Sequence, residues 1–173
     1  MQFSKFQGNG NDFIIIDNID GRLNLTSKEV QFLCDRRYGI GADGLILLNY
    51  FESSDFEMVY YNSDGNIGSM CGNGGRCIAA FTHMNNIAGE NQSFIAFDGC
   101  HEAIILGKNN TNMEWDIKLK LSKVTGVEEN DGNYLINTGS PHYVKFVKNI
   151  SDIDVEEEGR KIRYNNMFSP DGT

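Results

Sequence analysis

A cysteine stands immediately before a glycine-rich turn and a predicted helix. Residues 69–77 read SMCGNGGRC, and Cys71 is the first thiol of this segment. The first N–H groups of a helix lack partners within the helix and carry partial positive charge. Negative charge on the Cys71 sulfur is favoured at such a position, and the N–H groups of residues 72–74 could hold a carboxylate beside it. The segment could therefore supply an activated sulfur and an anion site next to each other.

Two other interpretations of Cys71 compete with this one. A lone cysteine is usually a small buried side chain, and Cys71 with Cys77 could be half of a metal site. The five-residue gap does not suit a zinc knuckle, and no second pair follows at zinc spacing, so we expect no metal. The residues alone thus favour a reactive and a buried Cys71 about equally.

The elements that must position this segment are predicted from apolar periodicity. Apolar residues at helical spacing predict a buried helix from Gly75 to about Asn85. A Thr-x-x-Glu capping box at Thr26 predicts a second helix. A third is predicted over residues 152–163, where acidic residues come first and basic ones last. Strands are predicted at residues 1–6, 13–17, 45–48, 55–61, 93–98, 102–106, 114–121, 134–137 and 143–147.

These elements indicate a strand-rich α+β protein. The stretch 123–132 is polar and turn-rich, which predicts a boundary between a domain of residues 1–122 and a domain of residues 123–173. Cys34 falls on the apolar face of the helix that follows Thr26, and Cys100 falls next to His101 between the predicted strands 93–98 and 102–106. We therefore expect both of these cysteines to lie in the core.

Composition excludes several classes of function. The 173-residue chain has a net charge of −9, which argues against nucleic acid as a partner because phosphate binding needs basic patches. No run of 18 apolar residues occurs, so no membrane span is expected. Four cysteines without a framework pattern suit a reducing compartment, and we expect a cytoplasmic protein.

The segment MCGNGGRC at residues 70–77 resembles the first cysteine signature of the diaminopimelate epimerases. These are cofactor-independent enzymes that interconvert LL- and meso-diaminopimelate in lysine and cell-wall synthesis. Four further segments resemble the family in the same order along essentially the whole chain. They are GNGNDF at 8–13, GIGADG at 39–44, YNSDG at 61–65 and TGSPH at 138–142.

The resemblance implies a fold and a site. It implies two similar domains, each a curved, mostly antiparallel sheet wrapped around a central helix, with the second domain incomplete here. It implies a small-molecule substrate, no cofactor, and Cys71 as one of two catalytic acid/base thiols. The substrate-binding residues that it implies are Asn11, Asn62, Gly72, Asn73, Ser140 and His142, where Gly72 and Asn73 act through backbone N–H groups and Ser140 replaces an Asn of the family.

Position 44 departs from part of the family. Some members have a Gln at this position that contacts substrate, whereas this chain has Gly44. We expect that contact to be missing here.

Two rival functions remain open. Proline racemases share a similar cysteine motif but have His where this chain has Asn73, so a proline racemase-like epimerase is one alternative. The other is a truncated, non-catalytic ligand-binding remnant, because the sequence stops before the family's second catalytic cysteine. For that reason we expect the chain by itself to be inactive. A homodimer is a possible assembly.

Overall fold

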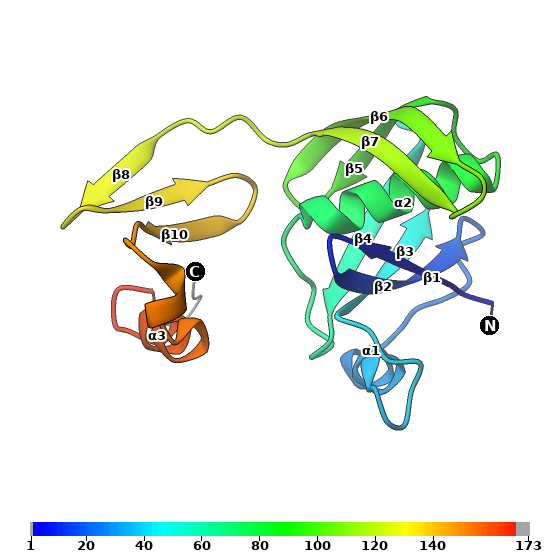
Figure 1. The fold of residues 1–173 in the computed structure, drawn as a ribbon. Coiled ribbons are helices and arrows are strands. Elements are labelled where there is room, and N and C mark those ends of the chain that lie inside the picture. Colours follow the sequence, from blue (N-terminus) through cyan, green and yellow to red (C-terminus); the bar gives the residue numbers. More distant parts are fainter. Residues whose placement is uncertain (1, 169–173) are drawn as a thin grey trace. The chain divides into compact units, whose positions relative to one another are not determined.

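The computed structural model describes residues 2–168 (Figure 1). The chain separates into two compact units, the first ending at Ser122 and the second beginning at Lys123.

The first unit contains one seven-stranded sheet in which the spatial order of the strands is their order along the chain. Neighbouring strands are antiparallel except in the pairs β2–β3 and β4–β5, which are parallel. Parallel neighbours need a crossover connection, and α1 (Ser27–Cys34) and α2 (Gly72–Met84) provide the two crossovers. The strands are β1 (Ser4–Gly8), β2 (Asn11–Asn18), β3 (Gly44–Asn49), β4 (Phe56–Asn62), β5 (Asn91–Ala96), β6 (Gly99–Asn109) and β7 (Glu114–Lys120).

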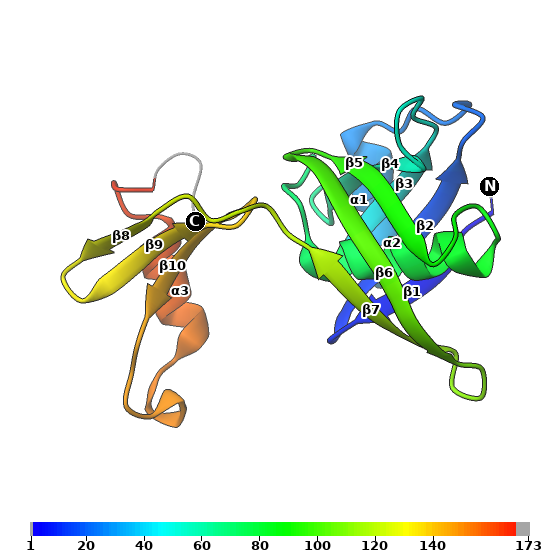
Figure 2. The same cartoon turned by 90° about the horizontal axis from the view of Figure 1, so that it is seen from above.

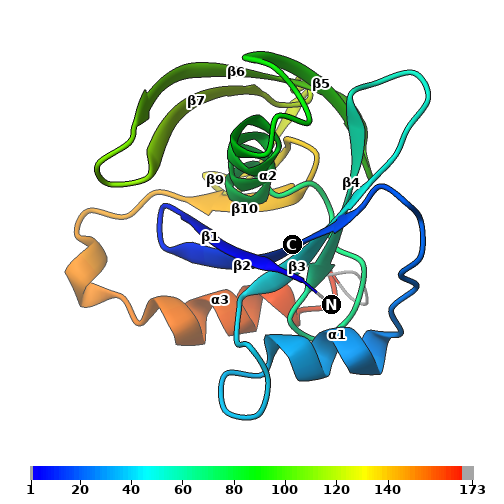
Figure 3. The same cartoon turned by 90° about the vertical axis from the view of Figure 1, so that its right-hand side faces the viewer.

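The sheet curls around α2, which contacts β1, β2, β3, β4, β6 and β7. Figure 3, in which α2 is seen nearly end-on, shows the strands of this unit curving around the helix. Figure 2 shows β6 and β7 lying across it. The α+β class and the mostly antiparallel sheet around a central helix are thus confirmed for the first unit.

The predicted start of this helix at Gly75 is wrong, because α2 begins at Gly72. Glycine is a poor residue for a helix interior when the helix is exposed. At this position packing outweighs helix propensity, because Gly74 and Gly75 are both buried. The glycine-rich turn is therefore the first turn of the helix itself.

Both faces of the central strands are buried. On the inner face, Phe13 and Ile15 of β2 pack in the cluster around α2 that includes Ile78. On the outer face, Ile14 and Ile16 pack with Val30 of α1. Burial on both faces explains why these strands read as continuous apolar runs rather than alternating patterns. The capping box is confirmed, since the Glu29 N–H donates to Thr26 Oγ1 and the Thr26 N–H donates to the Glu29 carboxylate at the start of α1.

The second unit contains a three-stranded antiparallel sheet in the order β10–β9–β8, followed by a short 3-10 helix and a longer α-helix. Its elements are β8 (Val127–Asn130), β9 (Asn133–Asn137), β10 (Pro141–Lys145), η1 (Ile150–Asp152) and α3 (Val155–Arg163). The sequence did not predict β8, because Val127 is its one apolar residue and only pairing with β9 makes it a strand. None of the described residues of this unit is fully buried.

Replacing Ile78 by Ala is expected to destabilise the first unit strongly. The Ile78 side chain is fully buried at the centre of α2, and removing buried methylene and methyl groups there leaves a cavity. We expect the free energy of unfolding, measured by urea titration, to fall by about 3 kcal/mol. The matched control is Ile67→Ala, since Ile67 is 60% exposed. Equal losses in the two variants would contradict the assignment of Ile78 to the core.

Candidate active site

Cys71 is the N-cap residue of α2. Its backbone is extended, with φ −103° and ψ 114°. Its sulfur accepts a hydrogen bond from the Gly74 N–H at 3.4 Å, and its carbonyl accepts one from the Gly75 N–H at 2.8 Å. The side chain is only partly buried. The thiol therefore lies at the positive end of a helix and is accessible, an arrangement that stabilises negative charge on the sulfur.

Close packing explains why glycines follow this cysteine. A Cβ added at Gly74 would lie 3.1 Å from Met58 Cε and 3.3 Å from Ile46 Cδ1. A Cβ added at Gly75 would lie 2.6 Å from Met70 Cε. Because Gly74 carries no side chain, the first turn of α2 lies close against Ile46 of β3 and Met58 of β4. The N–H groups that begin the helix are held in place by the sheet.

The side chain of Asn73 connects this helix start to the hairpin between β1 and β2. Its Nδ2 donates to Asn11 Oδ1 at 2.7 Å, and its Oδ1 accepts from Asn9 Nδ2 at 3.2 Å and from the Arg76 guanidinium. Asn9 and Gly10, the two residues of the hairpin turn, have φ values of 53° and 91°, as a type I′ turn requires. This turn places Asn11 at the start of β2, beside Asn73.

A charged cluster behind Asn11 fixes the orientation of its amide. Asn11 Nδ2 donates to Asp43 Oδ2 at 3.2 Å. A carboxylate only accepts hydrogen bonds, so the Asn11 nitrogen must face Asp43 and its oxygen must face Asn73. Arg36 joins Asp43 at 2.8 Å and Asp12 at 2.8 and 3.1 Å. The Arg36 guanidinium holds the pKa of the Asp12 carboxyl well below its ordinary value.

Sequence reasoning missed this cluster of Asp12, Arg36 and Asp43. The only signal for it was an acidic residue inside each of two glycine-rich turns, at positions 12 and 43. The turns lie 31 residues apart, and the parallel pairing of β2 with β3 brings them together. No local pattern in the chain predicts that pairing.

Asn62 is the last residue of β4 and is exposed. It pairs with Gly44 of β3 across the sheet. Its Nδ2 lies 3.2 Å from the position of a Cβ added at Gly68. Asn62 and Asn11 therefore lie at the ends of strands on either side of β3, but no contact joins their side chains among the described residues.

The other three cysteines differ from Cys71. Cys34 and Cys77 are 3% and 4% exposed. Burial raises the pKa of the Cys34 thiol to about 11, and burial together with the nearby Cys71 raises that of Cys77 to about 12. The prediction that Cys34 lies in the core is confirmed.

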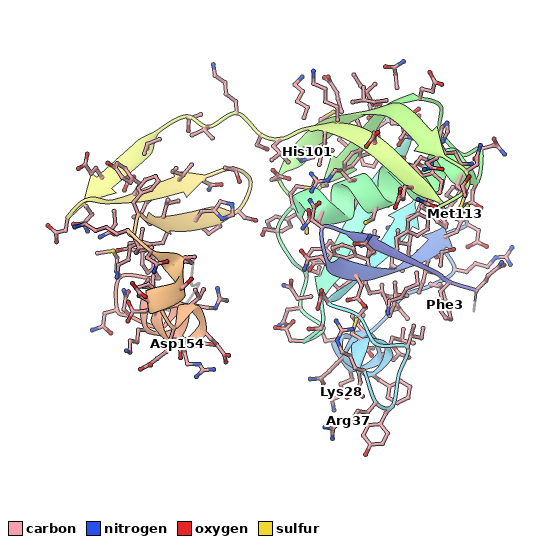
Figure 4. All side chains as sticks on the ribbon, in the orientation of Figure 1. Phe3, Lys28, Arg37, His101, Met113 and Asp154 are labelled. Carbon is pink, nitrogen blue, oxygen red and sulfur yellow. The ribbon has the colours of Figure 1, made fainter. Side chains whose placement is uncertain are left out.

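Cys100 was predicted to lie in the core and is exposed instead. Successive side chains of a strand point to opposite faces, and the neighbouring His101 is the buried one, at 1% exposure. His101, which Figure 4 labels, is in β6. Its Nε2 lies 2.8 Å from Asp98 Oδ1, and its Nδ1 lies 3.2 Å from the carbonyl of Lys120, the last residue of β7. These contacts indicate that His101 has a structural role.

Ser140 and His142 belong to the second unit, at the turn between β9 and β10. The Ser140 carbonyl accepts from the Thr138 N–H at 3.1 Å. His142 is exposed, and its Nε2 lies 2.9 Å from Thr138 Oγ1. Their assignment to the site stays a prediction.

Other features of the described residues do not compete with this site. A pocket of about 740 Å³ is bordered by Phe3, Asp20 and Arg22 and by none of the predicted site residues. Within residues 2–168, no group of three His, Cys, Asp or Glu side chains is arranged to hold a metal ion. None of the helices formed by these residues has the length and apolar character needed to cross a membrane.

Known proteins of similar sequence decide the family. The family model described as "Diaminopimelate epimerase" matches residues 3–119. The chain belongs to the diaminopimelate epimerase family. A relative of that name from Flavobacterium psychrophilum is 50% identical and is matched by 100% of the chain. Another from Chlorobaculum tepidum is 44% identical and is matched by 96% of the chain. The chain spans 66% and 65% of the lengths of these two relatives.

Solved structures support the fold of this family member. One is a probable proline racemase from Agrobacterium radiobacter, with a TM-score of 0.60 and 10% identity over 93% of this chain and 58% of the other. A hydroxyproline epimerase from Agrobacterium vitis also has a TM-score of 0.60, at 13% identity over 94% of this chain and 57% of the other. At such low identity these likenesses show a shared fold.

Cys71 is expected to alkylate faster than the other cysteines in the folded protein. Its sulfur is accessible and accepts a helix N–H, whereas Cys34 and Cys77 are buried with raised pKa values. Brief iodoacetamide treatment and mass-spectrometric mapping would measure the four rates. Cys100 is the internal control, since it is more exposed than Cys71 but does not lie at a helix terminus. Equal labelling of Cys71 and Cys100 would contradict the activation.

The first unit is expected to lose stability at alkaline pH partly through Cys77. Its folded pKa, about 12, lies above the ordinary thiol value of 9.0. The buried neutral thiol therefore contributes stability that is complete below pH 9 and is lost as pH rises toward 12. Urea unfolding under reducing conditions should show a smaller fall in stability between pH 9 and 11 for Cys77→Ala than for the wild type. Parallel pH profiles would count against this account.

Proposed function

We propose that this protein is a cofactor-independent amino-acid epimerase that interconverts LL- and meso-diaminopimelate. The observation that carries the proposal is the position of Cys71 as an accessible N-cap of α2, with the Asn11–Asn73 pair beside it. Membership of the diaminopimelate epimerase family supports the choice of substrate. The pathway we propose for the product is the biosynthesis of lysine and cell-wall precursors.

In the first step of the proposed mechanism, the start of α2 would hold the substrate carboxylate. The N–H groups of Gly72 and Asn73 begin α2 and have no partner within the helix. They lie at the positive end of the helix, next to the Cys71 sulfur. A carboxylate bound there would place the adjacent α-carbon within reach of the thiolate.

Proton transfer is the second step of the proposed mechanism. Cys71 as thiolate would take the α-proton and become a thiol, leaving a carbanion at the α-carbon. The helix N–H groups would stabilise the charge that develops on the carboxylate as the carbanion forms. A second thiol on the opposite face would then donate its proton to the α-carbon and become a thiolate. The configuration is thereby inverted, and the two sulfurs have exchanged protonation states.

The other cysteines of this chain are not placed to be that second thiol. Cys34 and Cys77 are buried and Cys77 lies within the same helix as Cys71, while Cys100 lies in β6. The proposed mechanism therefore assigns Cys71 one of the two roles and leaves the other to a group outside residues 2–168.

Amide side chains suit the remaining polar groups of the substrate. An amide both donates and accepts, so it can meet ammonium as well as carboxylate groups. Asn11 is held by Asp43 and Asn73 in a single orientation, and Asn62 is exposed at the end of β4. We propose both as substrate contacts.

Ligand protection of Cys71 tests the proposed substrate. We expect LL-diaminopimelate to slow iodoacetamide labelling of Cys71 without changing that of Cys100. L-Proline and trans-4-hydroxy-L-proline are the control ligands, because structures of similar fold are named for proline and hydroxyproline. Protection by these two and not by diaminopimelate would favour the proline racemase-like alternative. Following α-proton exchange and stereochemistry in deuterated water would then show whether bound ligand reacts.

Replacing Asn11 by Ala is expected to weaken this protection. The change removes a substrate contact and leaves Asn73 without its partner at 2.7 Å. The concentration of LL-diaminopimelate that halves the labelling rate should rise roughly ten-fold. Asn112→Ala is the matched control, since Asn112 is exposed in the turn between β6 and β7. An unchanged protecting concentration in Asn11→Ala would limit Asn11 to a role in the hairpin.

A further inference from the structure

Tyr60 lies on the side of β4 that faces α2. Alternate residues of a strand share a face, and Phe56 and Met58 of this strand belong to the core cluster around α2, with Tyr60 packed against it. Met58 reaches the position of Gly74 in the first turn of the helix. Tyr60 is two residues further along, toward the end of β4 that carries Asn62. It therefore lies at the helix start, on the sheet side of Cys71.

Two glycines leave a slot that the Tyr60 ring fills. A Cβ added at Gly44 would lie 2.4 Å from Tyr60 Cε2 and 2.9 Å from its hydroxyl oxygen. A Cβ added at Gly68 would lie 2.5 Å from Cδ1 and from Cε1 on the other edge of the ring. Phe13 packs edge-on at a centroid distance of 6.0 Å. The ring is held on several sides, so the position of its hydroxyl is fixed, beside Gly44.

The Tyr60 hydroxyl makes no hydrogen bond with any group in residues 2–168. The enclosed side-chain atoms without partners in that range are His83 Nδ1 and Trp115 Nε1, and the Tyr60 oxygen is not one of them. It is therefore accessible from outside. A phenylalanine would fill the same slot between the glycines, so packing alone does not account for the hydroxyl.

The phenol is a neutral donor at physiological pH. Burial, with the charges of Cys71 and Asp43, raises the pKa of Tyr60 to about 12. A protonated phenol can donate its hydrogen to a carboxylate without adding charge to the site. Gly44 has no side chain to offer the site, and the hydroxyl of Tyr60 supplies a polar atom next to Gly44.

We propose that Tyr60 is a substrate-contacting residue whose hydroxyl donates a hydrogen bond to the amino-acid carboxylate held at the start of α2. This inference rests on the proposed function and adds a contact on the sheet side of the site. Together with Gly44 and Gly68, the Tyr60 ring sets the width of the site on that side. A side chain at position 44 would displace the ring and remove the contact.

Tyr60→Phe tests the contact because it keeps the ring and removes only the hydroxyl. Its matched control is Tyr61→Phe, since Tyr61 packs in the outer cluster with α1 and away from Cys71. The readout is the concentration of LL-diaminopimelate that halves iodoacetamide labelling of Cys71. We expect it to rise roughly ten-fold in Tyr60→Phe, as for a lost hydrogen bond to a charged group, and to stay at the wild-type value in Tyr61→Phe.

Thermal unfolding without ligand separates contact from packing. A role in packing alone would lower the unfolding temperature of Tyr60→Phe and leave its protecting concentration unchanged, which would overturn the inference. Equal protection of wild type and Tyr60→Phe would overturn it as well, with the proposed function intact. If LL-diaminopimelate protects Cys71 in neither protein, the proposed function fails and the inference fails with it.

Discussion

The position of the Cys71 N-cap among the strand ends depends on how closely α2 approaches the sheet. The first turn of the helix lies against Met58 and Ile46, and the absence of a side chain at Gly74 favours this close approach. A helix that began with larger residues would stand further from β3 and β4. The thiol, the N–H groups and the surrounding strand ends would then lose their common position.

A chain of polar contacts links the outside of the sheet to this helix start. Arg36 follows α1 on the outer face and binds Asp12 and Asp43 at the strand ends. Asp43 orients Asn11, and Asn11 holds Asn73 of α2. The orientation of each group is fixed because carboxylates only accept hydrogen bonds and guanidinium groups only donate them. The amides beside Cys71 are thus oriented by residues that lie on the other layer of the protein.

The sequence predicted where helices and strands occur better than it predicted which of them pack together. Strong apolar patterns revealed most strands and the buried helix, and a capping box revealed α1. The start of α2 was missed because helix propensity disfavours the glycines that packing requires. Cys100 was placed in the core because alternation along β6 gives two choices of face, and the adjacent His101 takes the buried one. Asp43 and Tyr60 were missed because their roles arise from pairing between strands that no local pattern encodes.

The strands of the first unit lie side by side in the order in which they occur along the chain. Each new strand therefore pairs with the one made just before it, and the two longest connections are shortened by α1 and α2. Apart from the two connections that contain α1 and α2, the loops between paired strands are short, which lowers the entropy lost before each pairing is formed. The sheet can consequently form from pairings between segments that are neighbours along the chain, and α2, which carries Cys71 at its start, packs against strands that come both before and after it in the sequence.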